Sequence, residues 1–156
     1  MKVVKYMLID EIKVSDIQIN KDAKDWKEAI HKASVSLIES KKILPSYVDA
    51  MISVVEEKGP YIVITKHIAL AHARPEHGVL EKGLSFTTFG VPVPFGSELL
   101  DPVKLIITLA ATDSESHLDL LSELADILTD ESKTEKMFVA KNEQVFLDVL
   151  KSTYTR

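Results

Sequence analysis

Histidines are the residues of this chain best suited to chemistry, and three of the five fall within eleven residues. The central one, His72, lies between Ala71 and Ala73, whose small side chains leave room beside an imidazole. Arg74 follows, and Pro75 forces the chain out of an extended ladder, so His72 is expected at the end of a strand. An accessible imidazole with a cation nearby is suited to hold an anion.

A second informative junction surrounds His117. It follows a nearly continuous apolar run at 104–111 and a polar segment with several potential helix N-caps, in which Thr112 and Glu115 have capping-box spacing. His117 is therefore expected in the first turn of a helix that leaves a central strand, where free N–H groups favour a bound anion. If the strands before His72 and His117 are neighbours, the two imidazoles face each other.

Each of these residues also has an ordinary structural explanation. A histidine is most often a surface or partly buried residue with satisfied nitrogens, and a polar residue in a first helical turn can serve only as a cap. This explanation is favoured for His67 and His77, which lie in turn-like polar contexts, and it stays open for His72 and His117. Arg74 could equally be a solvated loop charge.

Other chemistries fit the sequence less well. Zinc ligation by His67, His72 and His77 would need a spacing of five and five, which matches neither the helical i, i+4 pair nor known zinc motifs. The chain has no cysteine, five glycines without a nucleotide-binding loop, and no serine-hydrolase motif. We therefore expect no metal and no cofactor. What remains is an imidazole that itself accepts and donates a group, such as a phosphoryl group whose charge needs N–H groups, a second imidazole or an arginine.

Composition sets the broad class. With 156 residues, 46% of them hydrophobic, one domain over residues 1–156 is expected. The net charge of −5 argues against nucleic-acid binding. The first residues show no signal-peptide pattern, and no apolar run approaches the ~20 residues needed to span a bilayer, so a cytoplasmic protein without membrane insertion is expected.

Hydrophobic periodicity predicts the elements that position the histidines. The chain reads as helices and strands with short connections, which predicts a compact sheet flanked by helices in the α/β or α+β class. The residues 92–97 are expected to form a loop, with Val93 and Phe95 as an apolar rim on which partners dock. The expected elements are a short helix near 5–11, an extended piece near 14–19, a helix from the cap Asp25 to about Ser40, a helix from the cap Ser46 to Gly59, strands at 61–64, 84–91 and 104–111, a helix with Leu118, Leu121, Leu124, Ala125 and Leu128 inward, and helices near 131–140 and 143–151, the last with Val145, Phe146, Val149 and Leu150 inward.

Two segments carry a resemblance to a known family. Gly59-Pro60-Tyr61-Ile62-Val63-Ile64, followed by Ile68-Ala69-Leu70-Ala71-His72-Ala73-Arg74-Pro75-Glu76 and Gly78-Val79, resembles the IIA component of the bacterial sugar phosphotransferase system (PTS). The likeness is to the mannitol/fructose type (EIIA type 2), and within it to the ascorbate-like branch, whose site reads much like Pro-His-Ala-Arg-Pro-Glu. Ser116-His117-Leu118-Asp119-Leu120-Leu121-Ser122-Glu123-Leu124 is similar to the segment of the family's second histidine. The resemblance extends from about Asp25 to Leu150.

The resemblance implies a mixed sheet between helical layers, a three-layer sandwich, and a phosphotransferase component. A phosphoryl group would pass from the carrier protein HPr to His72, then to a cysteine of a IIB partner, and finally to a sugar entering through the membrane component IIC. His117 would orient His72 or stabilise the phosphate. Two departures matter: Ala71 stands where the family usually has proline, and residues 55–58 lack an arginine common at that helix end. Arg74 is therefore expected to bind the phosphate in its place.

Two other functions stay open. One is a regulatory protein that uses the same phosphohistidine as a signal to a transporter, a kinase or a transcription factor. The other is a metal-dependent hydrolase that uses the histidine cluster. The transported sugar is not fixed by this sequence, although the local match leans towards ascorbate or a related acid or pentitol.

Overall fold

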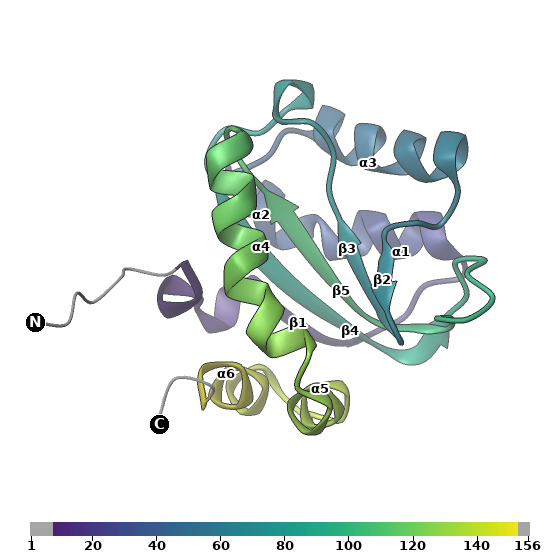
Figure 1. Cartoon of the computed structure of the whole chain (residues 1–156), viewed down its shortest axis with the longest axis vertical. Helices are drawn as coiled ribbons and strands as arrows, with labels where there is room; N and C mark the ends of the chain where they lie inside the picture. The colour runs from purple at the N-terminus through teal and green to yellow at the C-terminus, as the bar shows by residue number, and fades with distance from the viewer. Residues whose placement is uncertain (1–7, 153–156) are drawn as a thin grey trace, which may run out of the picture.

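A five-stranded mixed β-sheet forms the centre of the computed structural model, which describes residues 8–152 (Figure 1). The strand order is β1-β4-β5-β3-β2. The pairs β1–β4 and β3–β5 are parallel, whereas β4–β5 and β2–β3 are antiparallel. Because β3 and β5 are parallel neighbours, their carboxyl ends meet at the same edge of the sheet. The strands are β1 (Ile17–Lys21), β2 (Val63–Thr65), β3 (Ile68–Ala71), β4 (Gly83–Val93) and β5 (Val103–Ala110).

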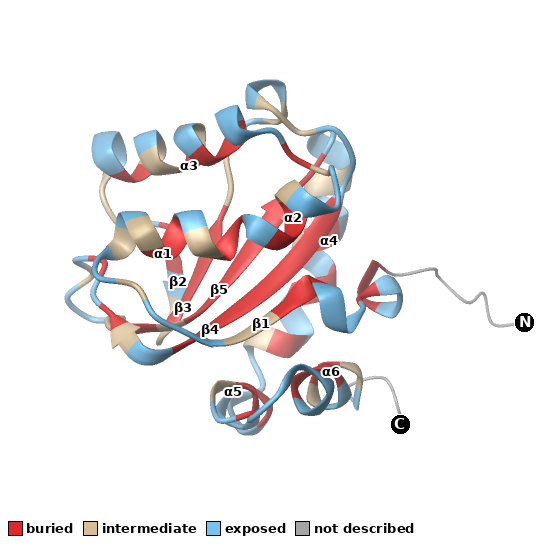
Figure 2. Cartoon of the chain, turned by 180° about the vertical axis from the view of Figure 1, so that it is seen from behind, coloured by how far each residue is buried: buried red, intermediate tan, exposed pale blue. Residues whose placement is uncertain are grey.

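Helices cover both faces of the sheet and confirm the predicted three layers (Figures 1 and 2). One hydrophobic core joins α1, α2 and α3 to one face, and a second joins α4, α5 and α6 to the other. Neighbouring residues of the central strands point alternately into the two cores, for example Ile106 and Ile107 of β5. The helices are α1 (Trp26–Ala33), α2 (Val35–Glu39), α3 (Pro45–Lys58), α4 (Ser114–Leu128), α5 (Glu131–Phe138) and α6 (Glu143–Lys151), with short 3₁₀ helices η1 (Leu8–Glu11), η2 (Val14–Asp16) and η3 (Pro75–His77).

Most expected elements are present near their predicted bounds. β5 is buried along almost its whole length, as its apolar run predicted, and α6 begins and ends as expected. The extended piece near 14–19 is η2 followed by β1, and the helix expected near 5–11 is a 3₁₀ helix over its described part, 8–11, while 5–7 lie outside the described residues. Within residues 8–152, no helix combines the length and the apolar character that crossing a bilayer requires.

The length of the helix that follows Asp25 and the start of α3 differ from the sequence predictions. Asp25 caps α1 as expected, but the helix ends at Ala33 and α2 follows after Ser34, whose hydroxyl donates to the Ile30 carbonyl. Ser46 is not the N-cap of α3. Leu44 occupies that position with Pro45 in the first turn, where a missing N–H costs nothing.

The segment before His72 forms a hairpin rather than one strand. Residues 63–65 form β2, His67 turns the chain with a φ of 71°, and Ile68–Ala71 returns as β3, a strand that the sequence prediction did not separate. The turn consists of Lys66 and His67, which agrees with the turn-like polar context expected for His67. His72 nevertheless follows a strand directly, as predicted.

The prediction of an exposed apolar rim at 92–97 is wrong. β4 runs through Pro92 to Val93, with a register shift after Thr88 that accommodates a residue without an N–H. Val93 and Phe95 are buried in the core under α1 and α3. They also lie at the far end of the sheet from His72, because Val93 pairs with the first residue of β5.

The inward faces of two helices are shifted from the predicted ones. In α4 the buried residues are Leu120, Glu123, Leu124 and Ile127, whereas Leu118 and Ala125 are exposed. Leu118 and Ala125 are seven residues apart, so they lie on the same side of α4, and this side faces away from the sheet. Glu123 can be buried because its Oε1 accepts the Ile9 N–H at 2.9 Å. In α6, Leu147 is buried in place of Val145.

Candidate functional site

His72 stands where the chain leaves the sheet. Its ring Nδ1 lies 2.8 Å from the carbonyl oxygen of Leu70. A carbonyl can only accept a hydrogen bond, so Nδ1 carries the ring proton and Nε2 keeps a free lone pair. The half-buried imidazole is therefore held in one tautomer, with its nucleophilic nitrogen available to a group that enters the site.

His117 is held in place by the capped start of α4. The N-cap is Asp113, not Thr112, and its carboxylate accepts the Ser116 N–H at 2.8 Å. Ser116 takes the place predicted for Glu115, and its hydroxyl accepts the Asp113 N–H at 3.1 Å. These hydrogen bonds lower the pKa of Asp113, which stays ionised. The His117 N–H, 3.0 Å from the Asp113 carbonyl, makes the first α-helical bond of that turn.

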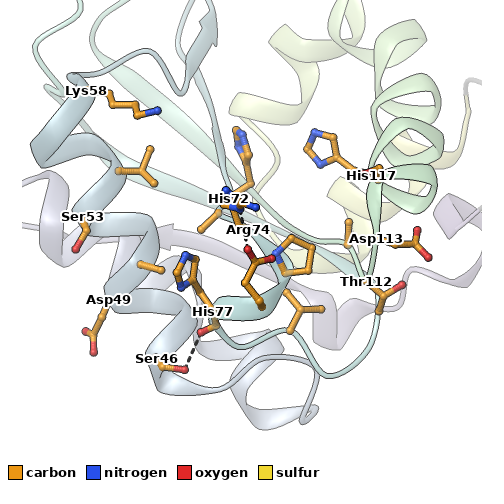
Figure 3. Close-up of a pocket in the computed structure, with 18 of the residues that line it drawn as sticks. Ser46, Asp49, Ser53, Lys58, His72, Arg74, His77, Thr112, Asp113 and His117 are labelled. Carbon is orange, nitrogen blue, oxygen red and sulfur yellow. Dashed lines mark hydrogen bonds and ion pairs between the residues drawn. The ribbon is translucent and has the colours of Figure 1, made fainter.

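The structure brings the two imidazoles together. The ring centroids of His72 and His117 are 5.6 Å apart, with their planes inclined at 45° (Figure 3). This adjacency follows from the parallel pairing of β3 and β5. Partial burial, together with the neighbouring His72, lowers the pKa of His117 below 6.5. His117 is therefore neutral at neutral pH and keeps one N–H to donate and one nitrogen to accept.

An open cavity of about 1380 Å³ surrounds the histidine pair. Its walls are α3, the segment from His72 to His77 and the start of α4 (Figure 3). Arg74 lines it but is exposed, and its Nε lies 2.8 Å from Oε2 of Glu76. The predicted arginine is thus beside the site and paired with a carboxylate. The exposed Leu118 also lines the cavity.

Lys58 was missed as a site residue by sequence reasoning. It lies in the last turn of α3 and lines the cavity across from α4 (Figure 3). The sequence showed only that this helix end lacks an arginine, and a lysine at the same place was not considered as a substitute. Among residues 8–152, Lys58 has no ion pair, so its ammonium group is free to meet an anion.

Tyr47 was also missed, and nothing but its helical spacing could have pointed to it. It is fully buried on α3, and its hydroxyl contacts backbone groups on both sides of the site. The hydroxyl oxygen lies 3.0 Å from the Ala73 nitrogen, 2.7 Å from the Leu109 oxygen and 3.2 Å from the Ala73 oxygen.

The remaining histidines of the cluster do not converge on His72. His67 lies at the opposite end of β3, where its Nδ1 is 2.7 Å from the Pro102 oxygen and its ring meets Phe138 edge-on. His77 lines the cavity, and its carbonyl accepts the Ser46 hydroxyl at 2.8 Å. A zinc site of the three predicted histidines is therefore ruled out by geometry, and residues 8–152 contain no other group of three potential ligands.

Comparison with known proteins gives a consistent result. Residues 11–153 match the model of the family described as "Phosphoenolpyruvate-dependent sugar phosphotransferase system, EIIA 2". The chain is 35% identical over 145 residues to the mannitol-specific cryptic phosphotransferase enzyme IIA component of Escherichia coli K12, which covers 92% of this chain and 97% of the relative. It is 32% identical over 138 residues to the ascorbate-specific PTS EIIA component of the same strain, covering 88% and 90%.

Solved structures show the same fold. The solution structure of the mannitol-specific cryptic enzyme IIA of Escherichia coli superposes with a TM-score of 0.85 at 33% identity, covering 94% of this chain and 99% of that one. The mannitol enzyme IIA in a complex with phosphorylated enzyme IIB, also from Escherichia coli, has a TM-score of 0.79 at 28% identity, covering 90% and 97%.

Proposed function

The chain belongs to the EIIA 2 family of the phosphoenolpyruvate-dependent sugar phosphotransferase system, and from this premise we propose that His72 is the residue that carries the phosphoryl group. The protein is a phosphotransferase component, a phosphocarrier that passes a phosphoryl group to a IIB component in sugar uptake. The match over residues 11–153 supports a single EIIA domain in this chain.

The hydrogen bond between His72 and Leu70 is the observation that carries the assignment of the phosphoacceptor. Since Nδ1 holds the proton, Nε2 attacks the phosphorus: the Nε2–P bond forms, the bond from phosphorus to the donor atom breaks, and the donor keeps that electron pair. A phosphoryl group on Nε2 makes the Nδ1–H a stronger hydrogen-bond donor. Its hydrogen bond to the Leu70 carbonyl therefore stabilises the phosphorylated ring. In the second step a thiolate of IIB attacks the phosphorus and forms an S–P bond. The Nε2–P bond breaks, and its electron pair returns to Nε2 of His72.

His117 and the two cations share the charge of the phosphoryl group in this proposal. The neutral His117 donates a hydrogen bond to a phosphoryl oxygen, and the arriving negative charge favours its protonated form. Arg74 exchanges Glu76 for the phosphoryl oxygens, which costs little because both side chains are exposed. Lys58 adds a charge from the opposite wall. Transfer of this kind needs mainly positioning and charge stabilisation.

The phosphoryl donor proposed here is HPr, and the membrane component IIC is an indirect partner, with the relay taking place in the cytoplasm. The two relatives are named for mannitol and for ascorbate, which supports a polyol or a sugar acid as the transported substrate, with the local motif leaning to the acid. A regulatory use of the same phosphohistidine is the competing function that the second experiment below separates.

The first experiment is labelling by enzyme I, HPr and phosphoenolpyruvate. The wild-type protein is expected to gain one acid-labile, alkali-stable phosphoryl group, and His72→Ala none. His31→Ala, which removes an exposed histidine of α1, is the matched control and should label normally. Full labelling of His72→Ala would refute the assignment of the acceptor.

The second experiment chases the labelled protein with a cognate IIB. A carrier is expected to lose its label to the IIB cysteine within seconds, with or without EDTA. Label that stays on His72 with every IIB tested, while phosphorylation changes binding to a regulator, would establish the signalling function instead.

A further inference from the structure

Tyr47 contacts the backbone at the point where the two site-bearing strands separate. The last paired residues of the β3–β5 ladder are Ala71 and Thr108. Ala73 and Leu109 lie just beyond that pair, and the Tyr47 hydroxyl reaches both of them from α3. The hydroxyl lies where Ala73 and Leu109 would hydrogen-bond to each other if the β3–β5 ladder continued.

The hydrogen-bond roles follow from the chemistry of a hydroxyl. Its lone pair accepts the Ala73 N–H at 3.0 Å, and its single proton goes to the Leu109 carbonyl at 2.7 Å, since the contact to the Ala73 carbonyl is longer at 3.2 Å. Tyr47 is 0% exposed and its hydrogen bond to the Leu109 carbonyl is buried, whereas Ala73 is half-buried at the cavity wall. Buried backbone groups need partners, and removal of the hydroxyl leaves the Leu109 carbonyl without this one and the Ala73 N–H without its fixed acceptor.

We propose that Tyr47 is a positioning residue for phosphoryl transfer, whose hydroxyl ends the β3–β5 ladder and fixes the backbone on both sides of the histidine pair. Ala73 directly follows His72, and Leu109 precedes the turn into α4, which carries His117. One hydroxyl thus sets both the direction in which His72 leaves the sheet and the place from which α4 starts. This inference rests on the proposed function of His72.

Two further observations agree with this role. Burial raises the pKa of Tyr47 to about 12, so the hydroxyl keeps its proton across the working range of the protein. The other backbone atom that fixes His72, the Leu70 carbonyl, is in β3, so Tyr47 and Leu70 hold the histidine from its two sides along the chain. Ala71 stands where the family usually has proline, so the backbone before His72 lacks the rigidity of a proline ring. The contacts of Tyr47 and Leu70 therefore matter more for holding His72 in place.

The test is Tyr47→Phe, which keeps the ring and removes only the oxygen. With phospho-HPr as the substrate, kcat is expected to fall roughly 10- to 100-fold, the range for reacting groups displaced by a fraction of an ångström to an ångström. The KM for HPr should stay within about twofold, because a buried residue touches no partner. Ile17→Val, a buried methyl deletion in β1 that is remote from the site, is the control for reduced stability and should leave kcat unchanged.

A spectroscopic measurement on the unphosphorylated protein makes the test independent of activity. Imidazole ¹⁵N shifts of His72 should show one tautomer in the wild type and averaging of both in Tyr47→Phe. The Ala73 amide hydrogen should exchange slowly with solvent in the wild type, although Ala73 lies beyond the β3–β5 ladder. This measurement uses only the wild-type protein, so it does not depend on folding of the variant. A wild-type kcat in the variant, or a rapidly exchanging Ala73 amide in the wild type, would overturn the inference. Absence of label on wild-type His72 would instead refute the proposed function and leave the tautomer and exchange results standing.

Discussion

Replacing Leu118 with alanine is expected to weaken docking of HPr and IIB without slowing the chemistry at His72. Leu118 lines the cavity beside His117 and keeps 65% of its surface exposed. It has no core beneath it, so its removal should leave the fold intact. Under the proposed function, an exposed apolar side chain next to the acceptor histidine is a natural contact for the phosphoryl donor.

The magnitude follows from the area that Leu118 offers. Complete burial of a leucine is worth about 1.5–3 kcal/mol. With 65% of the side chain exposed, about two thirds of that, roughly 1–2 kcal/mol, is available to a partner. Since 1.4 kcal/mol corresponds to a factor of ten in affinity, the dissociation constants should rise about 5- to 30-fold.

The assay is steady-state phosphoryl transfer with varied HPr, and then with varied IIB. Leu118→Ala should raise both KM values while kcat stays within about twofold. The matched control is Leu99→Ala, a leucine that is even more exposed (83%), in the connection before β5 at the end of the sheet remote from His72. An unchanged KM in Leu118→Ala, or an equal rise in Leu99→Ala, would show that partners do not dock over the start of α4.

Three further predictions concern charge at the site. His117→Ala should still be phosphorylated but should pass the group to IIB roughly 10²-fold more slowly, and an unchanged rate would leave His117 with only a structural role. Arg74→Ala should slow phosphorylation more than Arg74→Lys, because lysine keeps the charge but loses the planar fork; equal wild-type rates would make Arg74 a surface charge. Because the pKa of His117 is lowered in the folded state, the imidazole takes up a proton in the unfolded chain first as the pH falls below 6.5. The folded state therefore loses stability as the pH falls from 6.5 to the pKa of His117 in the folded protein. His117→Gln should therefore show a smaller fall in Tm between pH 7.5 and pH 5, and identical falls would contradict the lowered pKa.

Local sequence signals predicted the parts of the fold that depend on neighbouring residues. The run before Thr112 indicated a strand covered on both faces, and Asp25 marked a helix start through its side-chain acceptor; both are confirmed. The strand end at His72 was predictable because Pro75 cannot continue a ladder and small residues flank the ring. These features need only a few residues of context.

The sequence predictions were wrong at positions where tertiary contacts decide which side chains are buried. Leu118 fits the helical spacing predicted for an inward face, but α4 packs on the sheet with another side, which carries Leu120, Leu124 and Ile127. Glu123 is buried because a backbone N–H from η1 satisfies its carboxylate, a contact over 114 residues. Phe95 was expected at the surface because loop residues usually are, and instead it packs into the core under α1. No local pattern contains the partner in any of these cases.

The pairing of His72 with His117 shows how the two kinds of information combine. Sequence placed one histidine after a strand and the other at the start of a helix after a different strand, and left open whether those strands are neighbours. The sheet order answers this, because β3 returns from the β2 hairpin to lie parallel to β5 rather than at an edge. Parallel pairing then requires the two carboxyl ends to meet, and the ladder must stop for the side chains to approach across the gap. The Tyr47 hydroxyl lies at that stop, next to the gap between the two imidazoles, where the proposed function requires the phosphoryl group to be held.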